Sequence, residues 1–112
     1  MFTLEQQKAN RRLWVEALRS GKYEQGRHRL RRDEAYCCLG VLASLAGHSN
    51  EEIDGQGTLK RFPVAQKFVG LADDDGQFGG TSLADCNDQG KSFAEIADII
   101  ESEPLGLFVE SI

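Results

Sequence analysis

The sequence has no long apolar run, no internal repeat and no low-complexity segment, and only three of its 112 residues are cysteines. No stretch approaches the roughly 20 apolar residues that a membrane-spanning helix needs. Residues 1–8 lack the apolar core of a secretory signal peptide. An odd cysteine count without such a signal fits a reducing cytosol rather than a disulfide framework. We therefore expect no membrane segment, a cytoplasmic location, and Cys37, Cys38 and Cys86 as buried thiols.

The composition is that of a globular protein, with 40% hydrophobic and 28% charged residues. Its length allows one domain over residues 1–112. The formal net charge of -5 is unevenly spread. Residues 1–32 carry nine cations and three anions, a net charge of +6, whereas residues 33–112 carry four cations and fifteen anions, a net charge of -11. This asymmetry indicates either an anionic partner or two parts of the fold that neutralise each other.

Apolar periodicity predicts four or five short helices. A capping-box pattern at Thr3 predicts a helix over 4–19, with an apolar stripe that includes Leu13. The apolar segment 35–46 reads as a central helix buried on nearly all sides, and Gly40 inside it suggests a closely packed neighbouring helix. Further helices are expected from Phe62-Pro63 to Gly70, after Ser82, and over 93–103 behind a capping box at Ser92. Residues 48–61 and 71–81 read as loops.

Two segments have the pattern of short strands. Residues 27–32 alternate, and residues 105–110 are mostly apolar, so we expect them to pair. The predicted fold is therefore mainly α: a single small domain of four to five short helices with at most one small two-stranded β-ribbon. The expected core consists of Trp14, Leu18, Leu39, Leu42, Phe68, Phe93, Ile96 and Ile100.

Three blocks of the sequence, residues 14–26, 36–42 and 87–101, resemble a group of small proteins encoded by bacteriophages and prophages, to which no function has been assigned. The order of the blocks matches as well. The resemblance implies a phage origin and a site of action in the host bacterial cytoplasm. It implies no catalytic residue.

Motifs for catalysis, metals and nucleotides are incomplete. Residues 90–92 (Gly-Lys-Ser) lack the first glycine and the preceding strand of a P-loop, and residues 73–76 (Asp-Asp-Asp-Gly) lack the glycine and glutamate of an EF-hand. No cysteine or histidine pair has zinc-ligand spacing. A Cys38–His48 nucleophile pair stays open, although Cys38 lies in an apolar run. We therefore expect no catalytic residue, no metal and no cofactor.

Arginines are the candidate binding residues. On a strand over 27–32, Arg27, Arg29 and Arg31 share one face and are spaced to hold phosphates or carboxylates, with Arg11 and Arg12 as further contacts. The alternative is a solvated edge strand with weak ion pairs.

We expect a non-enzymatic accessory protein that binds a host protein or a small anionic ligand and modulates a host process, counter-defence being one example. A nucleic-acid-binding regulator that uses the basic first third is the alternative, and a cysteine-dependent enzyme is a third. The acidic helix 93–103 argues against nucleic acid. The sequence does not indicate an oligomeric state.

Overall fold

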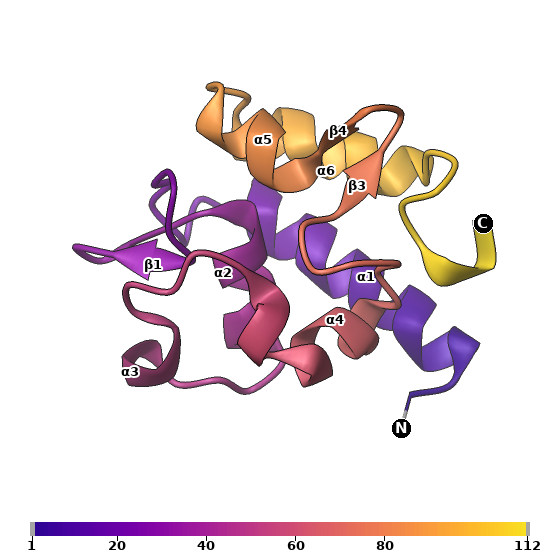
Figure 1. Cartoon of the computed structure of the whole chain (residues 1–112), viewed down its shortest axis with the longest axis horizontal. Helices are drawn as coiled ribbons and strands as arrows, with labels where there is room; N and C mark the ends of the chain where they lie inside the picture. Colours follow the sequence, from indigo (N-terminus) through magenta and orange to yellow (C-terminus); the bar gives the residue numbers. More distant parts are fainter. Residues whose placement is uncertain (1, 112) are drawn as a thin grey trace.

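The computed structural model describes residues 2–111 and shows a mainly helical domain that measures 35 × 28 × 24 Å (Figure 1). In this part of the chain the α-helices are α1 (Leu4–Arg19), α2 (Cys38–Leu45), α3 (Asn50–Ile53), α4 (Pro63–Val69), α5 (Leu83–Asp88) and α6 (Phe93–Ser102). Two 3₁₀ helices, η1 (Leu59–Arg61) and η2 (Val109–Ser111), are shorter. The strands are β1 (Arg31–Arg32), β2 (Ala35–Tyr36), β3 (Gln77–Phe78) and β4 (Thr81–Ser82). The predicted fold class is confirmed.

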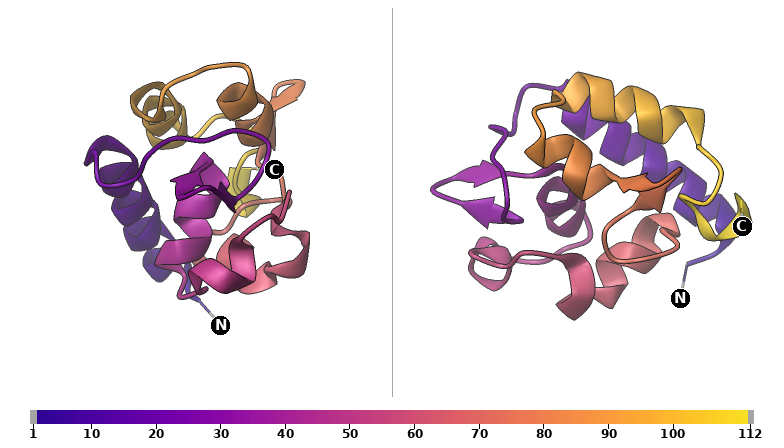
Figure 2. Two further views of the ribbon diagram at one scale, coloured as in Figure 1. Left: turned by 90° about the vertical axis from the view of Figure 1, so that its left-hand side faces the viewer. Right: turned by 45° about the horizontal axis from the view of Figure 1, so that its top comes forward.

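Helices α1 and α6 lie side by side along one side of the molecule (Figure 2). Both begin at the predicted capping boxes. The backbone N–H of Gln6 donates to the Thr3 hydroxyl, and the N–H of Glu95 donates to the Ser92 hydroxyl. These short-range signals place both helix starts correctly, because a capping box depends only on residues within one turn.

The buried face of α1 differs from the predicted stripe. Trp14 and Leu18 are buried as expected, and the Trp14 indole N–H donates to the Cys38 carbonyl at 3.0 Å. Leu13, however, is 49% exposed, and Arg11 is buried in its place. The prediction for Leu13 was wrong because α4, α6 and the C-terminal segment together cover the side of the helix that Arg11 shares with Val15.

Helix α2 is shorter than predicted, because residues 35–36 form strand β2 and Cys37 is the helix cap. Asp33 and Glu34 both have positive φ, of 52° and 67°, and turn the chain so that β2 pairs with β1. Gly40 lies against the backbone of a loop and not against another helix. A Cβ atom there would be 1.7 Å from the Leu30 carbonyl oxygen.

The predicted strand 27–32 and its pairing with 105–110 were wrong. Only Arg31–Arg32 is extended, because His28 takes a φ of 71° while its backbone N–H donates to the Asp88 carboxylate at 2.8 Å. The segment 105–110 makes a single bridge, between Phe108 and Leu71, and then enters η2.

Both predicted loops contain regular structure. Residues 48–61 hold α3 and η1, and residues 71–81 hold the β3–β4 hairpin, a second ribbon where at most one was expected. The predicted core residues are buried apart from Phe68, which is half-buried and stacks edge-on against Phe2 with ring centres 5.4 Å apart. None of the helices in residues 2–111 combines the length and the apolar character that crossing a membrane requires.

Candidate functional site

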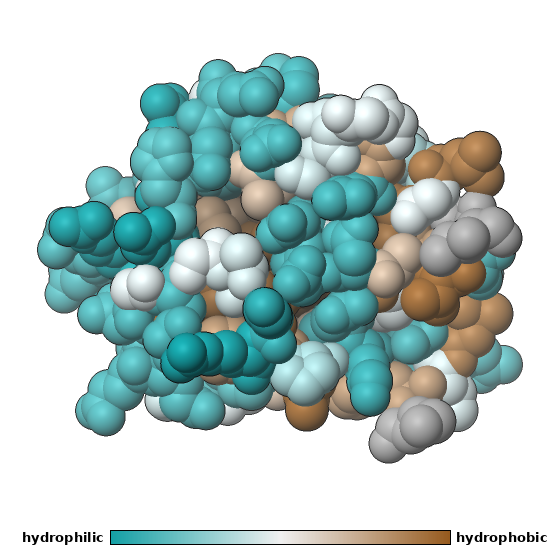
Figure 3. All heavy atoms as spheres, in the orientation of Figure 1, coloured by the Kyte–Doolittle hydropathy of each residue, from teal (hydrophilic) through white to brown (hydrophobic). Residues whose placement is uncertain are grey.

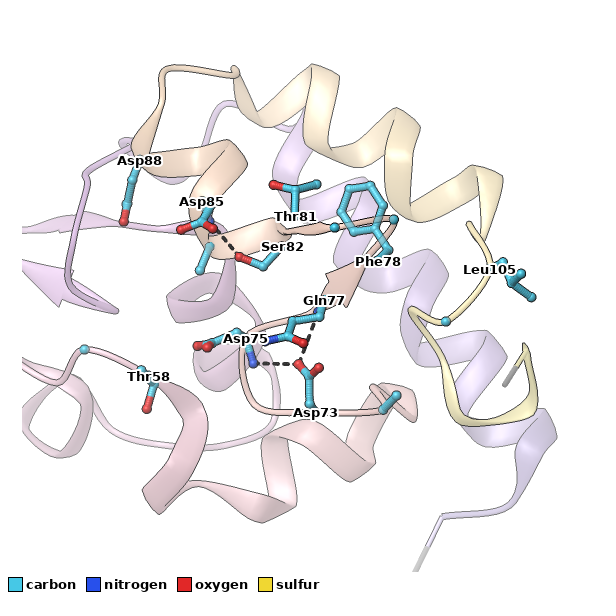
Figure 4. Close-up of a pocket in the computed structure, with 16 residues that line it drawn as sticks. Thr58, Asp73, Asp75, Gln77, Phe78, Thr81, Ser82, Asp85, Asp88 and Leu105 are labelled. Atoms are coloured by element: carbon cyan, nitrogen blue, oxygen red, sulfur yellow. Dashed lines mark hydrogen bonds between the residues drawn. The ribbon is translucent and has the colours of Figure 1, made fainter.

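A groove of about 760 Å³ opens between α5, the hairpin 72–82, the loop before η1 and the C-terminal segment (Figure 4). The hairpin and α5 supply most of its wall. Its side chains include Thr58, Asp73, Asp75, Gln77, Phe78, Thr81, Ser82, Asp85, Asp88 and Leu105. The groove therefore combines four carboxylates with hydroxyl groups and two large apolar side chains.

The Asp73 carboxylate stabilises the turn before β3, which forms part of the groove wall. One of its oxygens accepts hydrogen bonds from the backbone N–H groups of Asp75, Gly76 and Gln77, at 2.8–3.1 Å. Aspartate is favoured at this position of a turn because its short side chain reaches the next backbone donors. The acidic run 73–75 thus forms a closed turn that leads into β3.

The other carboxylates of the groove have no cationic neighbour in its wall. Among the described residues, no lysine, arginine or histidine lines the groove. Partial burial raises the pKa of Asp75, and the neighbouring carboxylates of Asp74, Asp73 and Asp85 raise it further. The groove therefore holds unneutralised negative charge that favours a positively charged occupant.

Asp88 lies at one end of the groove, next to the loop that contains Arg27, His28 and Arg29. Its carboxylate accepts from the His28 backbone N–H, and its second oxygen lies 3.4 Å from the His28 Nδ1. No group of three or more histidine, cysteine, aspartate or glutamate side chains within residues 2–111 is arranged to hold a metal ion. The arrangement is suited to ion pairs and hydrogen bonds with a partner's side chains.

None of the three cysteines lines this groove. All three are free and buried. Burial raises the pKa of the Cys37 thiol to about 11 and that of Cys38 well above its ordinary value. His48 packs against Phe62 and lies 3.6 Å from the Glu52 carboxylate. A reactive thiolate is not formed at neutral pH by these surroundings.

The five predicted binding arginines do not share a face. Arg27, Arg29 and Arg12 are exposed. Arg31 pairs with Asp54 at 3.1 Å and stacks on Tyr36. Tyr36 and, less strongly, Asp54 raise the pKa of Arg31.

Arg11 and Arg12 both line a smaller cavity of about 300 Å³ between α1 and α6. There the Arg11 guanidinium already binds Glu110 and Glu103, while Arg12 is exposed. The predicted set is thus divided between paired and exposed side chains.

A buried polar network joins the three sequence blocks that suggested the phage resemblance. The Asn87 side-chain oxygen accepts from the Cys38 backbone N–H at 3.2 Å and from the Gln25 amide at 3.0 Å, and its amide donates to the Gly26 carbonyl at 2.7 Å. Gln25 also accepts from the Phe93 N–H at the start of α6. The blocks are therefore one structural unit that orients α2, α5 and α6.

The sequence offered one overlooked signal for the groove. Residues 73–88 hold five aspartates and no lysine, arginine or histidine. The sequence pattern predicts a loop over residues 71–81 and does not connect it with Asp85 and Asp88. Only the fold brings these segments to one groove.

The structure is that of a small, mainly helical domain with an acidic groove. Comparison with known protein families matches residues 6–104 to a family described as a domain of unknown function (DUF8296), and the chain belongs to this family. No curated protein and no solved structure matches the chain.

Proposed function

We propose that this is a non-enzymatic accessory protein of a bacteriophage or prophage. It acts in the host cytoplasm, where it binds a host protein through the acidic groove. The occupant is a segment of the partner that carries arginine or lysine next to apolar side chains. The phage origin rests on the resemblance of residues 14–26, 36–42 and 87–101.

One observation carries the choice of partner. Four aspartates line the groove and no cationic side chain among the described residues does. A guanidinium or ammonium group placed there gains charge-assisted hydrogen bonds and offsets the burial and the carboxylate repulsion that together raise the pKa of Asp75.

Apolar surface at the groove favours a protein segment over a small polyamine. Leu105 is 81% exposed and Phe78 is half-buried, and both line the groove. Apolar side chains also gather at the right-hand edge of the molecule in Figure 3, in a view that is otherwise mostly hydrophilic. A polyamine has no side chains to cover this area, whereas a peptide does.

The experiment measures binding of a short labelled peptide that contains arginine and leucine. Wild type is compared with an Asp75→Asn, Asp85→Asn double variant. We expect about tenfold weaker binding in the variant, because two ion pairs of about 0.5–1 kcal/mol each are lost. A Glu5→Gln, Glu51→Gln double variant removes the same charge outside the groove and should bind like wild type. An equal loss of peptide binding in both double variants would mean that binding depends on the net charge of the protein and not on the groove.

A small anionic ligand is the other partner expected from the sequence, and the exposed Arg27 and Arg29 are its candidate contacts. An Arg27→Gln, Arg29→Gln double variant tests this possibility in two assays. One measures binding of the same peptide, and the other measures capture of ligands from host lysate. If this variant loses capture while the Asp75→Asn, Asp85→Asn variant keeps it, the binding site lies at Arg27 and Arg29 and not at the groove. The opposite pattern supports the groove.

A further inference from the structure

The C-terminal segment 104–110 closes one end of the groove, and the buried side chain of Arg11 binds to it. Leu105 and Gly106 line the groove, and Leu107 and Phe108 are fully buried beneath it. The Ala72 N–H donates to the Leu107 carbonyl and the Val109 N–H donates to the Gly70 carbonyl, both at 2.9 Å. These two bonds join the segment to the residues that lead into the groove's acidic turn.

Arg11 binds both sides of this junction. Its Nε donates to the Val69 carbonyl at 2.7 Å, one residue before the junction. Its two terminal nitrogens donate to the two carboxylate oxygens of Glu110, one residue after it. The guanidinium also stacks on the Phe108 ring at 3.7 Å. One planar group with several fixed donors thus connects two segments far apart in the sequence.

The chain makes room for this contact at Gly70. Its φ is 76°, and a Cβ atom there would be 3.0 Å from an Arg11 terminal nitrogen and 2.9 Å from the Gln7 side chain. Arg11 itself is 4% exposed, so its charge is well shielded from water and depends on Glu110 and Glu103 for compensation.

We propose that Arg11 is a positioning residue for the groove: by holding Glu110 and the Val69 carbonyl together, it fixes the end wall at 105–106 and the start of the acidic turn at 72–73. Without the Arg11–Glu110 pair the C-terminal segment detaches locally, and the groove loses its end wall while the helices stay packed. The consequence for peptide binding rests on the proposed function. The local detachment does not.

The experiment is amide hydrogen exchange on a Glu110→Gln variant, read residue by residue by NMR. The amides of Ala72 and Val109 report on the junction, and the amide of Gly76 reports on the Asp73 turn. We expect all three to exchange at least about tenfold faster, with Lys91, whose amide bonds to the Cys86 carbonyl, unchanged. Arg19→Met is the control, since it breaks ion pairs of α1 with Asp98 and Glu101 of α6, away from the junction.

Three outcomes overturn the proposal. In the first, the Val109 amide exchanges faster while exchange at the Gly76 amide is unchanged, which means that the segment loosens without affecting the turn. In another, Lys91 is accelerated equally, which means general destabilisation. In the third, Arg19→Met reproduces the pattern. Peptide binding to the same variants is a separate arm: if wild type does not bind the peptide, the proposed function fails, and the exchange data still decide the role of Arg11.

Discussion

Buried polar side chains carry specific roles at the scale of the single residue. Asn87 is fully buried, and its side chain forms hydrogen bonds with three residues from two other parts of the chain. A buried donor or acceptor left without a partner costs about 1–3 kcal/mol. Asn87 therefore stabilises the start of α2 and the turn at Gly26 at the same time.

Replacing Asn87 by alanine leaves the Cys38 N–H and the Gly26 carbonyl without their partner. We expect the free energy of unfolding in urea to fall by about 2–4 kcal/mol. Asn50→Ala is the matched control, because exposed Asn50 accepts one hydrogen bond from Tyr36 and should cost less than about 1 kcal/mol. Equal losses in both variants would contradict this role for Asn87.

The thiols give a second prediction for single residues. Because burial raises the pKa of Cys37 to about 11 and raises that of Cys38 well above the ordinary thiol value, almost no thiolate of these two residues is present at pH 8. A maleimide or disulfide reagent should label the native protein slowly and label all three cysteines quickly in denaturant. Fast labelling of native Cys37 or Cys38 would revive the nucleophile interpretation.

Close approach between elements depends on Gly40 in α2. A Cβ atom at this position would overlap the Leu30 carbonyl, which is backbone and cannot rotate away. We expect Gly40→Ala to lower the melting temperature strongly, with a loss of about 3 kcal/mol or more. Gly57→Ala is the control, because Gly57 has open space around it and should change stability by less than about 1 kcal/mol. A stable Gly40→Ala variant would mean that the Leu30 loop moves freely.

Helix α6 allows a cap and a core position to be compared within one element. Ser92→Ala removes the acceptor of the Glu95 N–H and should cost about 1 kcal/mol. Ile96→Ala leaves a fully buried position unfilled and should cost about 2–5 kcal/mol. Chemical denaturation measures both. Unchanged stability in Ile96→Ala would place this side chain outside the cooperative core.

The response of the whole molecule to pH depends on carboxylates with opposite shifts. The folded pKa of Asp75 is raised, so ionisation of this group opposes folding and its penalty grows as the pH rises through that pKa. Hydrogen bonds from Arg11 lower the folded pKa of Glu110, so its contribution is present at neutral pH and is lost as the pH falls through that pKa.

Two variants test these signs in melts across pH. Asp75→Asn should raise stability at pH 7 by a fraction of 1 kcal/mol, and this gain should vanish in acid. Glu110→Gln should lower stability at pH 7, and its deficit should shrink in acid. A gain from Asp75→Asn that persists in acid would trace the effect to something other than charge.

The sequence predicts those parts of the fold that depend on neighbours along the chain. The capping boxes at Thr3 and Ser92 and the apolar face of α6 act within one or two turns, and the structure confirms them. The error over residues 27–32 has a distant cause, because the backbone of His28 is held by Asp88, 60 residues away. The Asp33-Glu34 turn contains neither asparagine nor glycine, so no hairpin signal marked it.

The candidate site was harder to predict than the fold, because charge alone does not say which side chains meet. Arg11 and Arg31 look like Arg27 and Arg29 in the sequence, yet the first two are paired and the others are exposed. Ion pairs between residues 23 and 99 positions apart leave no local pattern. The aspartates of the groove are likewise gathered by tertiary structure.

The pairing of α1 with α6 has a consequence for synthesis on the ribosome. The apolar face of α1 emerges first, and α6, which packs on α1 together with α2 and α4, is made about 75–90 residues later. At elongation rates of about 5–20 residues per second, the face of α1 that packs on α6 lacks this partner for several seconds. During that time the nascent chain exposes an apolar helix, so chaperone engagement with the emerging chain should end when residues 93–102 have cleared the exit tunnel.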